Sequence, residues 1–410
     1  MHRACAFGAR RYFHIEAKPV SIPIYFWFPV LGCSGIGFIF MCIPPVADQF
    51  MGLFGVGYGG LSFFFSAIYW THSACQVPAG LLVDRLGALK SLALCLLLIF
   101  VGNTAPLLAP DSLALAVSMR LLTGLGTGTL FLVLIKILNI LTPPGHIGRA
   151  QGAQGAAFCL GTMLPYLTLP YAGKGAWLLA YLSGAAFCLV VAVLALRLPR
   201  EPLRTVRSTG SLGQTWQAVK TISTSRHILF MGCCHGFTFG SLNTLGNWMP
   251  SILADRKAGS TIEDWALATS LILLLGTLGR MFSGDAAKLM PRQTLISRIT
   301  LGVGVLFLVL AASGSPLAAL VPALLLAGLS GCMYASVFTL TIDMSAPSYA
   351  ATAAGFMNMV GNGVNILLIL VLGNAREFTG SFGPGLVISG VTAIGLWYLG
   401  RRIQWPTAVK

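Results

Sequence analysis

Charged residues are scarce in this sequence. Of its 410 residues only 9% are Asp, Glu, Lys or Arg, whereas roughly 25% are charged in ordinary globular domains. Hydrophobic residues make up 56% of the chain, and the mean hydropathy is +0.82. This composition excludes a soluble globular protein. It predicts an all-α membrane protein that crosses the bilayer many times, because a lone helix satisfies its own backbone hydrogen bonds in lipid.

The signatures of enzymes are also absent. We find no catalytic triad, no phosphate-binding loop and no spacing of His and Cys that is typical of metal ligands, so we predict neither an enzyme nor a bound cofactor or metal. Ten cysteines could suggest disulfides, but nine lie in apolar segments and are better interpreted as buried, unreactive thiols. These nine are Cys33, Cys42, Cys75, Cys95, Cys159, Cys188, Cys233, Cys234 and Cys332.

Long apolar runs dominate the sequence. We identify twelve, and each can cross the roughly 30 Å hydrocarbon core, which takes about 20 helical residues. They lie near 22–46, 53–79, 91–109, 112–141, 148–172, 176–197, 227–252, 264–287, 295–313, 316–342, 350–374 and 383–400.

The net charge of +15 follows the predicted topology and does not indicate nucleic-acid binding. If the N-terminus is cytoplasmic, four of the 26 Lys and Arg residues fall in outer loops (Lys174, Arg256, Lys257 and Arg376) and three fall within spans, which leaves nineteen on the cytoplasmic side. Positive charge is enriched on that side of membrane proteins. We therefore predict that both termini are cytoplasmic and that the protein lies in the plasma membrane, the inner membrane in a bacterium.

The longest hydrophilic stretch divides the chain into two halves. We predict a cytoplasmic tail at 1–20, a six-helix bundle at 21–197, a cytoplasmic linker at 198–226, a second six-helix bundle at 227–402 and a tail at 403–410.

The two halves resemble each other. A shift of 204 residues places Gly80 on Gly284 and Gly124 on Gly328, and it aligns LTGLGTG with LAGLSGC. Weak repetition of this kind is expected of parallel repeats that share a binding site at their interface.

The loop between the second and third spans carries the most specific motif. Residues 80–90 read GLLVDRLGALK, in which glycines suit a sharp turn and the charges suit an aqueous loop. The stretch resembles the signature GxxxDRxGxxK of the major facilitator superfamily. The resemblance implies twelve helices in two pseudo-symmetric six-helix bundles and transport by alternating access, and we expect a functional monomer. The matching residues are Gly80, Asp84, Arg85, Gly87 and Lys90.

In this family the motif has a gating role. The resemblance makes Asp84 a latch that braces a neighbouring helix end, and a plain loop-capping carboxylate is the alternative. The second copy of the loop is degenerate, because Lys288 replaces Asp84 and Pro291 replaces Gly87. Gating therefore rests mainly on the first half.

Arg120 begins the run RLLTGLGTGTLF, about nine residues or roughly 13 Å into the fourth span. A charge at that depth is costly unless it is paired or faces water. An unpaired guanidinium would favour a carboxylate or another oxyanion, and an arginine bonded to carbonyls is the alternative. The run resembles the family's RxxxGxG pattern, with Thr123 where a glutamine is common. We predict that Gly124, Gly126 and Gly128 allow close helix packing.

Arg280 is the second cation, in LGRMFSG of the eighth span, and it resembles a GRxxxG pattern that is widespread in the superfamily. The shift of 204 residues places Gln76 opposite it. Nitrate/nitrite porters, which parts of the chain resemble, have arginines at both positions. The glutamine therefore argues against nitrate, but not against another anion. Lys136, near the inner end of the fourth span, is interpreted as snorkelling toward Asp84.

Several neutral polar residues are further candidates. His72 and His235 are titratable and lie within spans, although a lone membrane histidine is more often a hydrogen-bonded packing residue. The segment NTLGNWMPSIL resembles the polar-aromatic-proline break of organic-anion and cyanate-type carriers, which makes Asn243, Asn247 and Trp248 candidates for an outer gate or pocket.

The eleventh span carries an asparagine stripe. Asn358, Asn362 and Asn365 are four and three residues apart, so they share one helix face, which must look inward. Weaker candidates are Tyr25, Tyr69, Gln151, Gln154, Tyr166 and Tyr334.

Acidic residues are absent from the predicted bilayer midplane, since all eleven Asp and Glu lie in tails, loops or span ends. This disfavours an exporter of organic cations. It leaves a uniporter, an exchanger that uses a counter-substrate, or a symporter whose coupling proton is carried by histidine or by the substrate. The two intramembrane cations favour a small organic anion bound by Arg120 and Arg280. The alternatives are a multidrug or amphiphile efflux carrier and a transporter-like receptor that does not translocate.

Overall fold

The computed structural model describes residues 23–143, 147–204, 219–345 and 350–403, and these residues contain helices and no strand. The first half contains α1 (Pro23–Met41), α2 (Ala47–Phe54), α3 (Tyr58–Ala74), α4 (Gln76–Leu86), α5 (Ala88–Thr104), α6 (Leu113–Leu141), α7 (Ile147–Thr168) and α8 (Ala176–Ala195), followed by α9 (Arg200–Arg204). The second half contains α11 (Arg226–His235), the π-helical η5 (Gly236–Gly240), α12 (Ser241–Asp255), α13 (Ala266–Met281), α14 (Ser283–Leu289), α15 (Arg292–Ala312), α16 (Pro316–Cys332), α17 (Tyr334–Asp343), α18 (Ala350–Thr379) and α19 (Gly383–Arg402).

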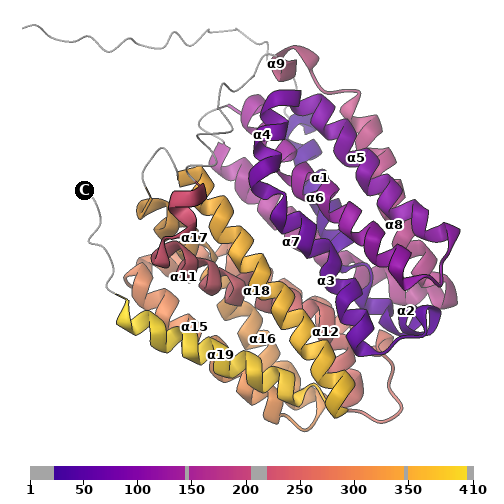
Figure 1. Cartoon of the computed structure of the whole chain (residues 1–410), viewed down its shortest axis with the longest axis vertical. Helices are drawn as coiled ribbons and strands as arrows, with labels where there is room; N and C mark the ends of the chain where they lie inside the picture. Colours follow the sequence, from indigo (N-terminus) through magenta and orange to yellow (C-terminus); the bar gives the residue numbers. More distant parts are fainter. Residues whose placement is uncertain (1–22, 144–146, 205–218, 346–349, 404–410) are drawn as a thin grey trace, which may run out of the picture.

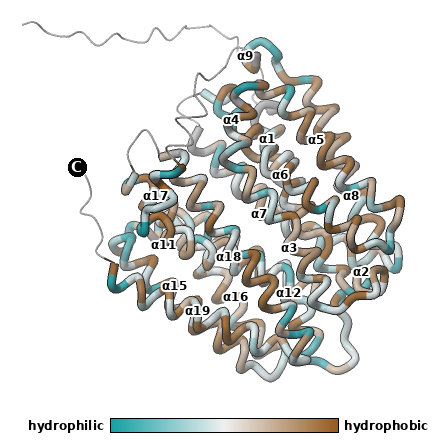
Figure 2. Tube along the Cα trace, viewed as in Figure 1, coloured by the Kyte–Doolittle hydropathy of each residue, from teal (hydrophilic) through white to brown (hydrophobic). Residues whose placement is uncertain are grey.

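Twelve membrane spans are made from these helices. By length and apolarity, eight helical stretches of the described chain could cross a membrane, or nine when the bent pair 263–289 is one span. One of the eight, Ala150–Ala195, holds both α7 and α8, and two further spans are interrupted, α3 with α4 and α11 with α12. The predicted twelve-helix membrane fold is therefore confirmed. Figure 1 shows the two halves as separate groups of helices with α3 beside α18 between them, and Figure 2 shows hydrophobic residues along the helices and hydrophilic ones near their ends.

Some of the predicted calls fall on parts of the chain that the structure does not describe. The predicted N-terminal tail lies outside the described residues, as do 205–218 of the predicted linker and 404–410 of the predicted C-terminal tail.

Four spans that we expected to be continuous are interrupted. The breaks lie at Cys75, at η5, at Phe282 and at Met333. The three single residues have ψ of −11°, 3° and −17°, whereas an α-helix has about −42°. Pro78 explains the first break, because its ring nitrogen cannot donate to the Ala74 carbonyl and clashes with it. At Phe282 the span bends by 56°.

The three glycines of α6 lie where neighbouring helices approach most closely. A Cβ on Gly124 would lie 2.3 Å from the Ile68 carbonyl oxygen of α3, and one on Gly128 would lie 2.7 Å from that of His72. On another face, a Cβ on Gly126 would lie 3.0 Å from the Cys95 carbonyl oxygen of α5. The small residues therefore lie against α3 and α5, as close packing between membrane helices requires.

Aromatic side chains join the halves at the end of the molecule opposite α9, which we call the distal end. Trp248 of α12 is fully buried there, and its indole nitrogen donates to the Ile369 carbonyl at 3.0 Å. Its ring lies 5.0 Å from Phe65 and 6.0 Å from Tyr58, both on α3. The gate candidate Trp248 is therefore part of the contact between the halves.

Two charged residues at the end of α18 reinforce the distal contact. Arg376 pairs with Asp255 at 2.7 Å, and its guanidinium lies 5.1 Å from the centre of the Tyr58 ring in the other half. Glu377 accepts a hydrogen bond of 3.3 Å from the backbone N–H of Gly59. These contacts bind α18 to the first turn of α3.

Pro250 does not break α12, contrary to our interpretation of the NWMP segment. The helix continues to Asp255, and the interruption lies earlier, at η5. Proline leaves the Gly246 carbonyl without its usual N–H partner, and the Tyr166 hydroxyl of the other half donates to that carbonyl at 2.5 Å. A bond across the halves thus replaces the missing helical one.

We expect Gly161→Ala to destabilise the protein. A Cβ there would lie 1.9 Å from the Ser34 carbonyl oxygen of α1, and overpacking of this kind costs about 1–3 kcal/mol. Gly155→Ala is the matched control, because it lies on the same helix with no atom within 4 Å, and alanine there should be neutral or stabilising by up to about 1 kcal/mol. Thermal melting of both purified variants checks this, and equal melting temperatures would contradict it.

We expect Arg376→Gln to loosen the distal contact. Losing about 1 kcal/mol at this half-buried ion pair would raise the open population about fivefold. The reporter is Ser62→Cys, because Ser62 is buried on α3 against Gly373 of α18. The alkylation rate of the introduced thiol in detergent, mapped by peptide mass spectrometry, should rise accordingly.

The matched control for this experiment is Lys288→Gln. It removes an exposed i,i+3 pair with Asp285 that joins no helices of different halves. If both variants change the alkylation of the reporter thiol equally, or neither changes it, the latch assigned to Arg376 is wrong.

Candidate functional site

A group of six side chains lies where the two halves meet near the middle of the bundle, and we call it the central cluster. Five of its members are next to the helix interruptions: Gln76 follows the break at Cys75, His235 and Phe239 border or lie in η5, Arg280 precedes the break at Phe282, and Tyr334 follows the break at Met333. The sixth is Asn358 of the unbroken α18. Interrupted helices of this kind often form substrate sites in transporters.

Arg280 is held by neutral groups. Its guanidinium carbon lies 3.7 Å from the centre of the Tyr334 ring and 5.7 Å from that of Phe239. One amino group contacts the Cys159 sulfur of α7, in the other half, at 3.2 Å. No described Asp or Glu pairs with it. Aromatic faces and a thiol stabilise the cation without neutralising it, so the donors at the guanidinium edge remain suited to a carboxylate or sulfonate.

A hydrogen-bond chain crosses the halves beside this cation. The Asn358 amide donates to Gln76 Oε1 at 2.6 Å, and its oxygen lies 2.8 Å from His235 Nε2. The other ring nitrogen of His235 lies 3.2 Å from the Thr238 hydroxyl. The His235 ring also stacks on Phe239 at 5.8 Å. Four of the predicted site residues are thereby brought together: Gln76, His235, Arg280 and Asn358.

Arg120 lies apart from the central cluster. It is 3% exposed, it donates to the Ile39 carbonyl of α1 at 2.9 Å, and its guanidinium carbon lies 5.7 Å from the Phe64 ring. Arg120 is the eighth residue of α6, about 10 Å from the distal start of that helix. This arrangement favours the structural alternative for Arg120, and the two arginines share no contact.

The remaining polar candidates lie in the packed region between the cluster and the distal end. His72 contacts the Thr127 hydroxyl at 3.2 Å and the ring of Phe40 at 4.9 Å. Asn243 accepts from the Tyr69 hydroxyl of the other half at 3.3 Å. Asn247 donates to the Asn243 carbonyl at 2.7 Å. These side chains bond helices to one another.

The asparagine stripe of α18 is divided between two environments. Asn362 donates to the Asn358 carbonyl at 2.9 Å, and its own side-chain oxygen is buried without a partner. Both polar atoms of the buried Asn365 also lack a partner, next to Gly240 of η5. Only Asn358 reaches the central cluster.

The signature loop forms the turn between α4 and α5 at the linker end. Gly87 has φ of +80°, a conformation that favours glycine, and Gly80 lies on α4, where a Cβ would meet no atom within 4 Å. Arg85 and Lys90 are exposed. The side chain of Asp84 lies outside the described part of the structure, so its latch role stays a prediction. Lys136 donates to the Val83 carbonyl at 3.4 Å, one residue before it.

Sequence reasoning missed Phe239 and placed Tyr334 among the weaker candidates. Both lie beside glycine-rich helix interruptions, GFTFG and SGCMY. A glycine pair within an apolar span followed by an aromatic residue is the signal that could have found them. Within the described chain, no three His, Cys, Asp or Glu side chains could hold a metal ion, and the nine described cysteines are free.

Comparison with known proteins agrees with this architecture. The family model of the Major Facilitator Superfamily matches residues 30–369. The chain is 28% identical over 357 residues to the probable sulfoacetate transporter SauU of Cupriavidus necator, covering 80% of this chain and 81% of that protein. It is 23% identical over 359 residues to the hexuronate transporter of Bacillus subtilis, covering 80% and 82%.

Solved structures show the same fold. The inward open conformation of the xylose transporter XylE from E. coli has a TM-score of 0.72 at 14% identity, over 94% of this chain and 96% of that one. The nucleoside transporter NupG has a TM-score of 0.75 at 14% identity, over 93% and 99%. Since the family model covers most of the sequence and the solved structures share its fold, the chain belongs to the Major Facilitator Superfamily.

Proposed function

We propose that the protein carries a small organic anion across the membrane by alternating access, with Arg280 binding the anionic group. The observation that carries this proposal is the setting of Arg280 at the contact between the halves, where its described partners are a thiol and two aromatic rings. A cation in that setting has spare donors for an incoming carboxylate or sulfonate.

The relatives support the same substrate class. The printed names of three of them are transporters of sulfoacetate, hexuronate, and galactarate or D-glucarate. All of these substrates are small anions with polar groups. In this chain, the amide groups of Gln76 and Asn358 lie beside Arg280's aromatic partners and would bind the uncharged polar part of the substrate.

The direction of access follows from the charge pattern. We propose that the linker end faces the cytoplasm of a bacterial inner membrane, because nineteen of the 26 Lys and Arg lie on that side of the predicted topology. The distal end is then the outer face, and the contacts of Trp248, Arg376 and Glu377 close it. Rocking of the halves about the central cluster would break these contacts and admit substrate from outside.

Arg120 has a different role in this proposal. Its bond to the Ile39 carbonyl holds α6 against α1 close to the outer face. We therefore assign substrate binding to Arg280 alone and leave Arg120 as a packing residue of the first half.

We expect Arg280→Gln to weaken anion binding about 10- to 100-fold, because a hydrogen bond to a charged group contributes about 1.5–3 kcal/mol. Arg280→Lys keeps the charge but loses the planar fork, so it should lie between the two. The measurement is thermal stabilisation by sulfoacetate, glucuronate and glucarate, with a neutral sugar and an organic cation for comparison. A ligand at 100 times its Kd adds about 2.7 kcal/mol.

Arg292→Gln is the matched control, because it removes an exposed arginine that pairs with Asp343 at the linker end. Unchanged anion binding in Arg280→Gln would overturn the proposal. Stabilisation by bulky cations alone would favour the efflux carrier. Binding of an anion without flux in proteoliposomes would favour the receptor.

A further inference from the structure

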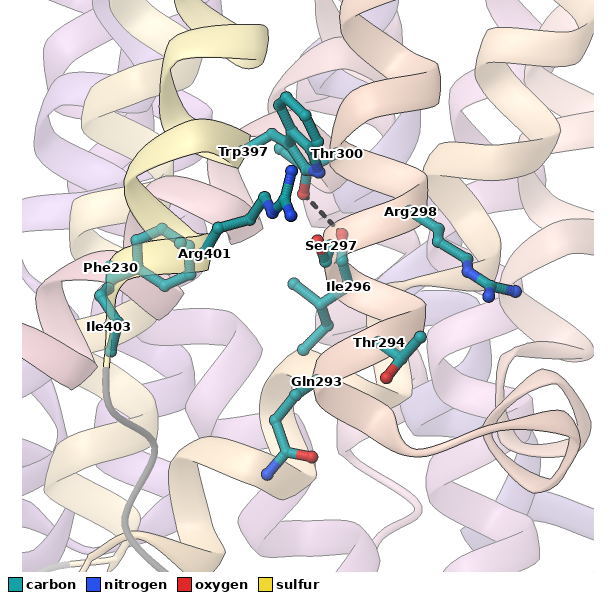
Figure 3. A pocket seen from close by; sticks show the side chains of 11 residues that line it. Phe230, Gln293, Thr294, Ile296, Ser297, Arg298, Thr300, Trp397, Arg401 and Ile403 are labelled. Carbon is teal, nitrogen blue, oxygen red and sulfur yellow. Dashed lines mark hydrogen bonds between the residues drawn. The ribbon is translucent and has the colours of Figure 1, made fainter.

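A second cavity lies at the linker end of the second half, away from the central cluster. It has a volume of about 350 Å³ and is formed by the first turns of α15, the last turn of α19 and Phe230 of α11. Gly400 allows α19 to approach α11 there, since a Cβ at that position would lie 2.5 Å from the Phe230 ring. Figure 3 shows the side chains that line the cavity.

The lining is basic and rich in unused hydrogen-bonding groups. Arg401 and Arg298 contribute to it, and no acidic residue does. Figure 3 shows the Arg401 guanidinium directed toward Ser297 and Thr300, next to the Trp397 ring, whose centre is 5.4 Å away. The side chains of Gln293, Thr294 and Ser297 have no hydrogen-bond partner within the described chain. A guanidinium beside hydroxyl and amide groups is suited to the oxygens of a phosphate.

The surface beside the cavity is apolar. Along α15 and α19, Val305, Val309, Ile388, Val391 and Leu399 are 44–58% exposed. These residues follow the cavity toward the interior of the membrane, because α15 starts and α19 ends at the linker end. Trp397 lies between the apolar surface and Arg401, the position that tryptophan prefers at a membrane interface.

We propose that this cavity binds the phosphate of an anionic phospholipid headgroup, with Arg401 as the principal ligand and the acyl chains lying along α15 and α19. Basic pockets between membrane helices on the cytoplasmic side are typical sites for such headgroups. A bound lipid would connect α11, α15 and α19, and α11 ends at His235 of the central cluster. The proposal does not depend on the transported substrate.

The test compares two arginines that line the same cavity. Figure 3 shows the Arg298 guanidinium directed away from Arg401, and one of its amino groups lies 3.9 Å from the Met290 sulfur instead. Arg401→Gln and Arg298→Gln therefore remove equal charge from one cavity, but only the first removes the group that points into it. The purified, delipidated protein is titrated with phosphatidylglycerol, phosphatidylcholine, inorganic phosphate and glycerol 3-phosphate, and binding is followed by native mass spectrometry and thermal shift.

We expect phosphatidylglycerol to bind the wild type, Arg401→Gln to weaken that binding about tenfold, and Arg298→Gln to leave it within about twofold. Equal losses in both variants would show general surface charge and overturn the proposal. Equal binding of phosphatidylcholine would overturn the anionic headgroup, and equal stabilisation by either soluble phosphate would show a free-anion site in place of a lipid site. If Arg401→Gln does not fold, Ser297→Leu, which fills the cavity, must give the same loss of phosphatidylglycerol.

Discussion

The packing of α3 against α18 is the contact on which the arrangement of the two halves depends. It begins at the distal end, where Glu377 accepts from the Gly59 N–H, and it ends at Gln76 and Asn358 in the central cluster. Between these points the helices lie very close, since a Cβ on Gly373 would be 2.8 Å from the Tyr58 carbonyl oxygen. Because α18 is one unbroken helix, a separation at its distal end must also change the position of Asn358, which couples the outer contact to the cluster.

The scarcity of charge explains how the two intramembrane arginines are held. Neither has an ion-pair partner within the described chain, and each is stabilised by groups that cost little to bury. Arg120 uses a backbone carbonyl and the Phe64 ring, and Arg280 uses a thiol and two rings. A carbonyl oxygen is a strong acceptor and a thiol sulfur is a weak one. The two cations of the same sequence class therefore differ in how much hydrogen-bonding capacity they retain.

The sequence was sufficient to predict the number of spans and the family, because apolar length and the loop from Gly80 to Lys90 are local signals. It also identified Arg280, Gln76, His235 and Asn358 individually, since polar side chains within apolar spans are conspicuous. It could not predict that they meet, because their contacts join residues up to 282 positions apart. The interruptions at Phe282 and Met333 have no proline to mark them, and Trp248 could be assigned to the distal contact only once Tyr58 and Phe65 were known to face it.

The chemistry of the central cluster follows from what Arg280 is not bonded to. If Arg280 were paired with a buried carboxylate, a substrate anion would have to displace a partner whose loss costs about 3–5 kcal/mol. Its present contacts with Tyr334 and Phe239 are of the kind that contribute about 0.5–2 kcal/mol and leave the edge of the guanidinium accessible. The bond between Gln76 and Asn358 is likewise a neutral one that a substrate hydroxyl could replace at small net cost. An incoming anion therefore competes with weak, neutral interactions at both groups, and its binding energy remains available to move the halves that those groups connect.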